Sequence, residues 1–177
     1  MPETVLDTPV GPIGLHWTGK TLTGVDLEPP GPIEAQGEVP DPTRSALGRQ
    51  LDQYFADGTA SFDLSLDLGG TPFQQRVWAA IRAIPAGSTR TYRDLARDLG
   101  TAPRAVGQAC RANPCPIVVP CHRVVGSTGK LTGYDGGVMR KAWLIAHEWP
   151  AQAAPANGLP AAPGTGAQHP RATGPGG

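Results

Sequence analysis

The most reactive pairing in this chain is a cysteine followed directly by a histidine, Cys121 and His122, within Pro-Cys-His-Arg-Val at residues 120–124. A thiolate is a strong nucleophile, and a neighbouring imidazole can lower the pKa of a thiol toward the working pH. The apolar run at residues 117–119 predicts a strand that ends at the cysteine. Adjacent side chains on a strand point to opposite faces, so a cysteine that only fills the core fits equally well. These five residues alone favour neither interpretation.

A nucleophilic cysteine needs a base, and the base needs a group that orients it. His122 is the adjacent candidate base. Glu148 is the only glutamate after residue 71, and it follows His147 at the end of a predicted helix. A lone acid there is more often an ion-pair partner than a catalytic orienting group, and the sequence does not place Glu148 beside His122.

The three cysteines, Cys110, Cys115 and Cys121, do not have the spacing of a zinc site, even with His122 added. We therefore predict no metal site. We also expect no cofactor. The odd cysteine count and the absence of a signal-peptide pattern argue against a secreted disulfide framework. No apolar run reaches the ~20 residues that span a bilayer. We expect a cytoplasmic protein with reduced thiols and no membrane contact, in which a disulfide between Cys115 and Cys121 would form only under oxidation.

Charge is distributed unevenly, although the 177-residue chain has a formal net charge of zero. Residues 1–70 contain 3 basic and 11 acidic residues, a net charge of −8, and residues 71–150 contain 11 basic and 4 acidic residues, a net charge of +7. This asymmetry predicts an acidic domain joined to a basic domain that meets a polyanion. Mutual attraction between two solvated surfaces is a second explanation, compatible with the first.

The first part of the chain predicts a small α/β domain. Residues 13–17 and 22–27 predict two strands, and residues 45–55 place apolar side chains at helical spacing. Residues 62–68 alternate strictly between apolar and polar, which is typical of a half-buried strand. Residues 29–42 are rich in proline, glycine and acidic residues and predict a loop.

The second part predicts helices joined by short turns. Gly69 and Gly70 indicate a joint, and Thr71 is the expected N-cap of the next helix. The last helix is expected to carry Val138, Ala142, Ile145 and Trp149 along its buried stripe. Residues 150–177 are mostly alanine, proline and glycine and predict a disordered tail.

The sequence of this basic part predicts two short helices joined by a tight turn, which is typical of a helix-turn-helix. The sequence Thr-Tyr-Arg-Asp at residues 91–94 resembles a capping box, and Gly100 is a natural helix end. A second helix begins at residues 101–103 and exposes Arg104 and Arg111. Many helical hairpins are plain packing units, but exposed arginines in a basic region favour DNA binding.

Further short stretches follow one another in a set order. They are Phe-Gln-Gln-Arg-Val-Trp at 73–78, Ile-Pro-Ala-Gly at 84–87, Thr-Tyr at 91–92, Arg-Ala-Val-Gly at 104–107, Asn-Pro at 113–114, Ile-Val-Val-Pro-Cys-His-Arg-Val at 117–124, Gly-Tyr at 133–134, Gly-Gly at 136–137, Lys141, and Trp-Leu-Ile-Ala-His-Glu at 143–148. This set resembles the catalytic domain of the O6-alkylguanine-DNA alkyltransferases, the methylated-DNA–protein-cysteine methyltransferases. Residues 4–68 resemble the family more weakly, mainly at the Thr-Pro-Val-Gly-Pro turn of residues 8–12.

The resemblance implies a fold and an activity. It implies an α/β N-terminal domain at residues 1–70, ribonuclease-H-like, and a mainly α C-terminal domain with a helix-turn-helix at residues 71–149. The implied activity is DNA repair by irreversible, single-turnover transfer of an alkyl group from O6-alkylguanine in double-stranded DNA to a cysteine. O4-alkylthymine is a possible further substrate. The resemblance implies a protein that acts as a monomer.

The resemblance also implies roles for single residues. Cys121 would accept the alkyl group, His122 would deprotonate it through a water molecule, and Glu148 would orient His122. Asn113 would brace the turn that holds the cysteine. Tyr92 would donate a proton to N3 of the departing guanine and, as a DNA-contacting residue, crowd the phosphate.

Other implied roles concern DNA and the alkyl pocket. Arg104 would fill the gap left by a flipped nucleotide while its helix lies in the minor groove. The backbone of DNA would meet Gln74, Arg93 and Ser127, and the substrate pocket would be lined by Val124, Tyr134, Asp135 and Gly136.

The chain departs from the family at Asp135, where small or hydroxyl residues are common, and a carboxylate there could narrow the pocket. The zinc ligands of the vertebrate members are absent from residues 1–70, and the tail after Trp149 has no assigned counterpart. Alternatives are a non-enzymatic alkyl-lesion-binding protein, which would lack the acceptor cysteine, an alkylation-sensing regulator, and a cysteine hydrolase.

Overall fold

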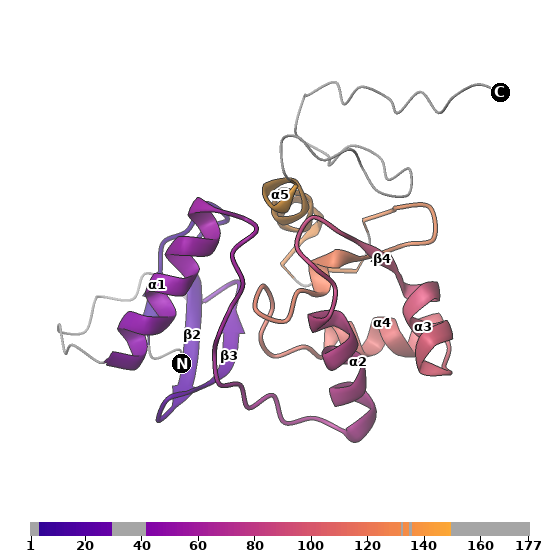
Figure 1. The fold of residues 1–177 in the computed structure, drawn as a ribbon, viewed down its shortest axis with the longest axis horizontal. Helices are drawn as coiled ribbons and strands as arrows, with labels where there is room; N and C mark the ends of the chain where they lie inside the picture. Colours follow the sequence, from indigo (N-terminus) through magenta and orange to yellow (C-terminus); the bar gives the residue numbers. More distant parts are fainter. Residues whose placement is uncertain (1–3, 30–41, 132, 135, 150–177) are drawn as a thin grey trace.

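The computed structural model describes residues 4–29, 42–131, 133–134 and 136–149. Asp135, most of the predicted loop at 29–42 and the predicted tail at 150–177 lie outside the described residues. The described chain has a small sheet with one helix at its amino-terminal end and a helical part after residue 71 (Figure 1). None of the described helices has the length and apolar character that crossing a bilayer requires.

The amino-terminal sheet is antiparallel, in the order β1 (Thr4–Leu6), β2 (Ile13–Thr18) and β3 (Thr21–Asp26). The two predicted strands are confirmed as β2 and β3, and the pairing of Leu15 with Val25 places both side chains in the core. The helix α1 (Pro42–Ala56) lies beside this sheet (Figure 1) and confirms the predicted helix.

The prediction of a strand at residues 62–68 is wrong, although its alternation of burial is present. The segment makes one isolated parallel bridge, between Leu66 and Leu22. The amide of Asp63 donates to the Gln50 side chain at 2.8 Å, and the Gln50 side chain donates back to the Asp63 carbonyl at 2.9 Å. At Asp63 a side chain of α1 therefore takes the backbone groups that a neighbouring strand would otherwise pair, and the backbone bonds to β3 are made through Leu22.

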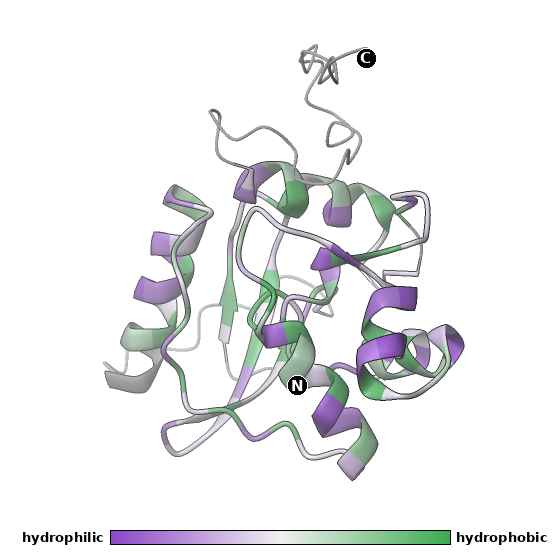
Figure 2. Ribbon diagram, turned by 45° about the vertical axis from the view of Figure 1, so that its right-hand side comes forward, coloured by the Kyte–Doolittle hydropathy of each residue, from purple (hydrophilic) through white to green (hydrophobic). Residues whose placement is uncertain are grey.

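Three short helices form the centre of the second part: α2 (Pro72–Arg82), α3 (Tyr92–Leu99) and α4 (Pro103–Arg111). Thr71 caps α2 as predicted, and Thr91 forms a capping box with Asp94 in which both hydrogen bonds are present. Gly100 ends α3 with a left-handed φ of 66°, a conformation that glycine adopts without strain. Hydrophobic and hydrophilic residues alternate in bands along these helices (Figure 2).

The prediction of a strand at residues 117–119 is also wrong. The chain turns tightly there, with Ile117 at a φ of +74°, and Cys121 opens a turn of 3-10 helix, η1 (Cys121–Arg123). Prolines at positions 114, 116 and 120 have no N–H group to donate to a strand ladder. The strand comes after the cysteine, as β5 (Val124–Val125), which pairs in parallel with β4 (Arg90–Thr91).

The last helix, α5 (Val138–Glu148), forms as predicted, but its buried face is rotated away from part of the predicted stripe. Val138 is 48% exposed, whereas Lys141 and Glu148 are buried together with Ala142, Leu144 and Ile145. The face is rotated because Lys141 and Glu148, two helical turns apart, both bond to groups inside the protein. One continuous cluster of buried residues joins the sheet, α1 and the later helices.

Candidate active site

Cys121 is 6% exposed, and the side chain of Asn113 holds the loop around it. The Asn113 amide nitrogen donates to the Val119 carbonyl at 2.9 Å and lies 3.2 Å from the Cys121 Sγ atom. The Asn113 oxygen accepts from the Cys115 amide at 3.0 Å. One side chain thus ties together both ends of the turn and the sulfur that follows it.

A cavity of about 30 Å³ lies against the Cys121 side chain. The volume is enough to hold a water molecule. It is lined by residues from both parts of the chain: Leu27, Cys110, Asn113, Pro116, Cys121, Gly133 and Tyr134. Leu27 comes from the end of β3, so the amino-terminal part contributes directly to this cavity.

The other two cysteines have environments that keep them protonated. Burial raises the pKa of the Cys115 thiol to about 12, and burial together with the nearby Cys121 raises the pKa of the Cys110 thiol to about 12. Thiols with such a pKa carry almost no thiolate at neutral pH and are poor nucleophiles. Chemistry at either of these two sulfurs is therefore disfavoured.

His122 is fully buried and bonds to the carboxylate of Glu148, with its Nε2 atom 2.6 Å from Oε1. Burial alone would raise the pKa of Glu148, but the charge of His122 and the hydrogen bonds from His122 and Arg123 outweigh it and lower the pKa to about 2. The Arg123 guanidinium favours the ionised carboxylate also when His122 is neutral, and the carboxylate then accepts the Nε2–H hydrogen. This assigns the basic lone pair of a neutral His122 to Nδ1, a buried atom for which the described residues provide no hydrogen-bond partner.

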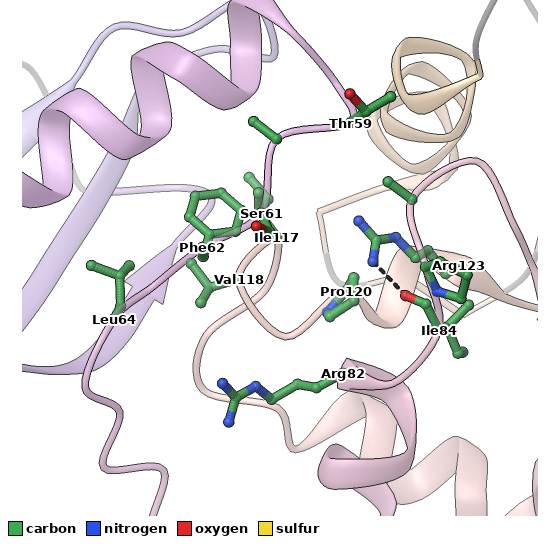
Figure 3. A pocket seen from close by; sticks show the side chains of 13 residues that line it. Thr59, Ser61, Phe62, Leu64, Arg82, Ile84, Ile117, Val118, Pro120 and Arg123 are labelled. Atoms are coloured by element: carbon green, nitrogen blue, oxygen red, sulfur yellow. Dashed lines mark hydrogen bonds between the residues drawn. The ribbon is translucent and has the colours of Figure 1, made fainter.

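Arg123 completes the surroundings of this carboxylate. Its Nε atom donates to Glu148 Oε2 at 2.8 Å and its Nη2 atom to Oε1 at 2.9 Å, which is a two-pronged ion pair. Its Nη1 atom donates to the Ile84 carbonyl at 2.6 Å, the bond drawn in Figure 3. A separate cavity of about 320 Å³, shown in that figure, lies between residues 59–64 and the loop before the cysteine, and Arg123 is in its lining.

A residue of the amino-terminal part also reaches Glu148. The hydroxyl of Tyr54, on α1, donates to Glu148 Oε1 at 2.7 Å. The carbonyl oxygen of the same tyrosine lies 2.6 Å from the Nε2 atom of His147 and accepts its hydrogen. Burial, then the charge of Glu148, raises the pKa of Tyr54, so its hydroxyl is a neutral donor.

Lys141 lies fully buried beneath β5. Its ammonium donates to the Val124 carbonyl at 2.6 Å and to the Tyr92 hydroxyl at 3.5 Å. Burial lowers the pKa of Lys141, while Cys121 and Cys110 act in the opposite direction. Burial, followed by the two cysteines, raises the pKa of Tyr92, so this hydroxyl keeps its proton at neutral pH.

Three of the five predicted DNA-contacting residues are exposed at the surface of the helical part. Arg93 is at the start of α3, Arg104 at the start of α4 and Ser127 in the turn after β5, and all three are exposed. Gln74 uses its side-chain oxygen in the capping box of α2, where it accepts from the Thr71 amide at 2.9 Å. Gln74 is half-buried, as is Tyr92, the fifth residue of the predicted set, whose hydroxyl bonds to Lys141.

Among the described residues, no group of three or more histidine, cysteine, aspartate or glutamate side chains could hold a metal ion. The predicted pocket residue Gly136 lies close to Leu27, whose Cδ1 atom would be 2.5 Å from an added Cβ.

Three residues around the site were not assigned a role by sequence reasoning: Tyr54, Arg123 and Lys141. The sequence contains a feature that could have pointed to Lys141, because it lies seven residues before Glu148 and on the same helix face. The feature that could have pointed to Arg123 is weaker: it is a charged residue within an apolar run. Tyr54 had no such feature, since its position in an apolar helix stripe is typical of a core aromatic residue.

Comparisons with known proteins give one consistent result. Residues 72–149 match the family model described as 6-O-methylguanine DNA methyltransferase, DNA binding domain, and residues 1–68 match the model of its ribonuclease-like domain. A methylated-DNA–protein-cysteine methyltransferase of Mycobacterium bovis is 47% identical over 144 residues, which is 79% of this chain and 87% of that protein. The Salmonella typhimurium protein of the same name is 56% identical over 105 residues, which is 58% of this chain and 61% of that protein.

Solved structures agree with these matches. A variant of the O6-methylguanine methyltransferase of Mycobacterium tuberculosis superposes with a TM-score of 0.71 at 46% identity, covering 86% of this chain and 94% of that one. The M. tuberculosis protein in complex with DNA superposes with a TM-score of 0.70 at 44% identity, covering 82% of this chain and 91% of that one.

Proposed function

This chain belongs to the 6-O-methylguanine DNA methyltransferase family, and from that premise we propose that Cys121 is the residue that accepts the alkyl group. The protein repairs alkylated DNA by transferring the alkyl group directly to one of its own cysteines, and DNA is its partner. The observation that carries the assignment is the environment of Cys121, which borders a small cavity, lies 3.2 Å from the Asn113 amide nitrogen, and precedes a histidine bonded to Glu148.

In the proposed reaction the Cys121 sulfur attacks the alkyl carbon of O6-alkylguanine. A sulfur–carbon bond forms, the bond between that carbon and O6 breaks, and its electron pair stays on the guanine. The thiol proton passes through a water molecule to Nδ1 of His122, which is the basic nitrogen because Nε2–H is bound to Glu148. No described group is placed to break the resulting thioether, so each molecule reacts once.

The departing guanine needs a proton, and we assign its delivery to Tyr92. The Tyr92 hydroxyl is protonated at neutral pH and accepts from the Lys141 ammonium, and its hydrogen would be donated to N3. A cation behind the hydroxyl stabilises the negative charge that the oxygen gains as it donates. Lys141 also holds the Val124 carbonyl in the strand that would line the base.

We further propose that α3 and α4 act as a helix-turn-helix that places Arg104 in the base stack. Arg104 is the second residue of α4, where a long side chain extends beyond the helix end. A base inside a duplex hides its O6 atom, so the nucleotide has to leave the stack, and an inserted arginine would fill the gap. Exposed arginines on α2, α3 and α4 provide the positive surface that the phosphates require: Arg76, Arg82, Arg93, Arg97, Arg104 and Arg111.

The finer fold assignments are proposals of the same kind. We propose a ribonuclease-H-like fold for the sheet and α1, and a division into two domains at Gly69 and Gly70, which have φ angles of 55° and 78°. We place the reaction in the cytoplasm as a monomer, because the acceptor has to stay a reduced thiol and all named groups belong to one chain.

Mass spectrometry of the protein after reaction with a duplex containing O6-methylguanine tests the assignment. We expect one added methyl group, on Cys121, in an amount that never exceeds the amount of protein. Cys121→Ser serves as the variant without acceptor, and Cys115→Ser as the matched control that keeps full transfer. A methyl group on another residue, or several repaired guanines per protein molecule, would refute the proposal.

A further inference from the structure

We propose that Tyr54, in the amino-terminal part of the chain, is a positioning residue for alkyl transfer that acts on His122 through the carboxylate of Glu148. The inference rests on the proposed function, since His122 serves as a base only if Cys121 is the acceptor. It assigns to the sheet-containing part of the protein a role in the chemistry of a site whose reacting groups all lie after residue 91.

The geometry places the side chains of Tyr54, His122 and Arg123 on the carboxylate of Glu148. Glu148 Oε1 lies 2.7 Å from the Tyr54 hydroxyl and 2.6 Å from Nε2 of His122. Tyr54 is 0% exposed and Glu148 is 2% exposed, so water does not compete for these bonds. A change at the tyrosine hydroxyl therefore acts directly on the oxygen that orients the imidazole.

Two donors to this carboxylate differ in kind. Arg123 brings a permanent charge and keeps Glu148 ionised. Tyr54 is a neutral donor whose hydrogen bond disperses the negative charge on Oε1. Removal of the hydroxyl leaves the ion pair intact and makes Oε1 a stronger acceptor toward Nε2–H of His122.

The groups that face this carboxylate come from three elements. They are Tyr54 on α1, His122 and Arg123 on η1, and, behind the tyrosine, His147 on α5. His147 is the other nearby imidazole, but it bonds to the Tyr54 main-chain carbonyl. A change of tyrosine to phenylalanine leaves that carbonyl, and hence the His147 bond, in place.

Packing holds the tyrosine ring in position independently of its hydroxyl. The ring lies 5.3 Å from the Phe62 ring and 5.4 Å from the His147 ring, measured between centroids. Phenylalanine at position 54 therefore keeps these contacts, and only the hydrogen bond to Glu148 is lost.

The expected effect of Tyr54→Phe is a shift in the pH dependence of transfer. With a more basic Glu148 behind it, His122 holds a proton at Nδ1 more tightly and stops acting as a base at a higher pH. A hydrogen bond worth about 1 kcal/mol corresponds to a shift of about 0.5–1 pH unit in the acid limb of the rate profile, toward higher pH.

The experiment measures single-turnover methyl transfer to the full-length protein between about pH 5 and pH 9. It compares the unchanged protein, Tyr54→Phe and Phe62→Leu, which loosens the same packing without touching Glu148. We expect the acid limb to move only in Tyr54→Phe. Coincident profiles for Tyr54→Phe and the unchanged protein, or an equal shift in Phe62→Leu, would overturn the inference. Mass spectrometry of the unchanged protein distinguishes failure of the Tyr54 inference from failure of the proposed function, because a methyl group away from Cys121 refutes the proposed function itself.

Discussion

At the scale of single residues, the carboxylate of Glu148 has the most partners in the site. It is buried and accepts four hydrogen bonds, from Tyr54, His122 and Arg123. Two buried charges are tolerated together because their bonds satisfy each other, whereas either charge alone would be costly. This explains why a glutamate at a helix end serves both as an ion-pair partner and as an orienting group for the histidine.

Glu148→Gln is expected to lower both stability and transfer rate. The pKa of Glu148 falls from an ordinary value near 4.5 to about 2 in the folded protein. A lowered pKa stabilises the fold above the unfolded-state pKa, and that contribution is lost as the pH falls toward the folded-state pKa. We expect a loss of about 3 kcal/mol in unfolding free energy at neutral pH, shrinking as the pH falls from about 5 to about 2.

Denaturant unfolding across this pH range measures the effect. Glu28→Gln is the control, since Glu28 is exposed and lies 4.0 Å from Arg140. We expect the control to change unfolding by less than about 0.5 kcal/mol. A Glu148→Gln deficit that stays constant between neutral pH and about pH 2 would contradict the assigned ion pair.

At the scale of elements, the helix α4 separates two tasks. Its inner face buries Val106, Ala109 and Cys110, and the last of these lines the cavity beside Cys121. Its first turn exposes Arg104 away from that core. A change at Arg104 should therefore affect the handling of DNA without disturbing the reacting groups.

Arg104→Ala is expected to slow repair of duplex DNA by about 10- to 100-fold, because extrusion of a base costs a few kcal/mol that an inserted side chain offsets. Reaction with the free base O6-benzylguanine, which needs no extrusion, should change little. Arg82→Ala, an exposed arginine on α2, controls for the loss of one positive charge. Equal losses on the duplex and on the free base would refute the role of Arg104.

At the scale of the whole molecule, the two parts of the chain meet where Glu148 is placed. Gly58 follows α1, and a Cβ atom there would lie 2.3 Å from the His147 carbonyl oxygen and 2.9 Å from the Cα atom of Glu148. These are backbone atoms, so the end of α5 would have to move. The amino-terminal part thus sets the position of a group used in the second part.

Gly58→Ala is therefore expected to destabilise the protein by about 1–3 kcal/mol and to slow alkyl transfer. Gly48→Ala is the matched control, because Gly48 lies within α1 with nothing within 4 Å of an added Cβ. Alanine there should raise stability by about 0.5–1 kcal/mol. Thermal unfolding and single-turnover rates of both variants check this, and an unchanged transfer rate in Gly58→Ala would contradict the coupling.

Local signals predicted much of the secondary structure. The capping residues Thr71 and Thr91 and the glycine at position 100 mark helix ends through their own backbone and side-chain bonds, so they are readable without the fold. Strands were harder to predict, because residues 62–68 and 117–119 have a suitable pattern but some of their backbone groups bond to side chains, Asp63 to Gln50 and Val119 to Asn113. The apolar pattern of a segment does not reveal that a side chain from elsewhere in the sequence will bond to its backbone.

The sequence by itself determined the reactive pair, Cys121 and His122, the charge division, and the family through the order of its motifs. The tertiary structure alone decided which nitrogen of His122 is basic, that burial disfavours the thiolates of Cys110 and Cys115, and that Tyr54 shares an oxygen of Glu148 with His122. The reason is that a pKa and a hydrogen bond depend on burial and on groups brought together by folding. Tyr54 and Glu148 are 94 residues apart, and only the packing of α1 against the end of α5 joins them.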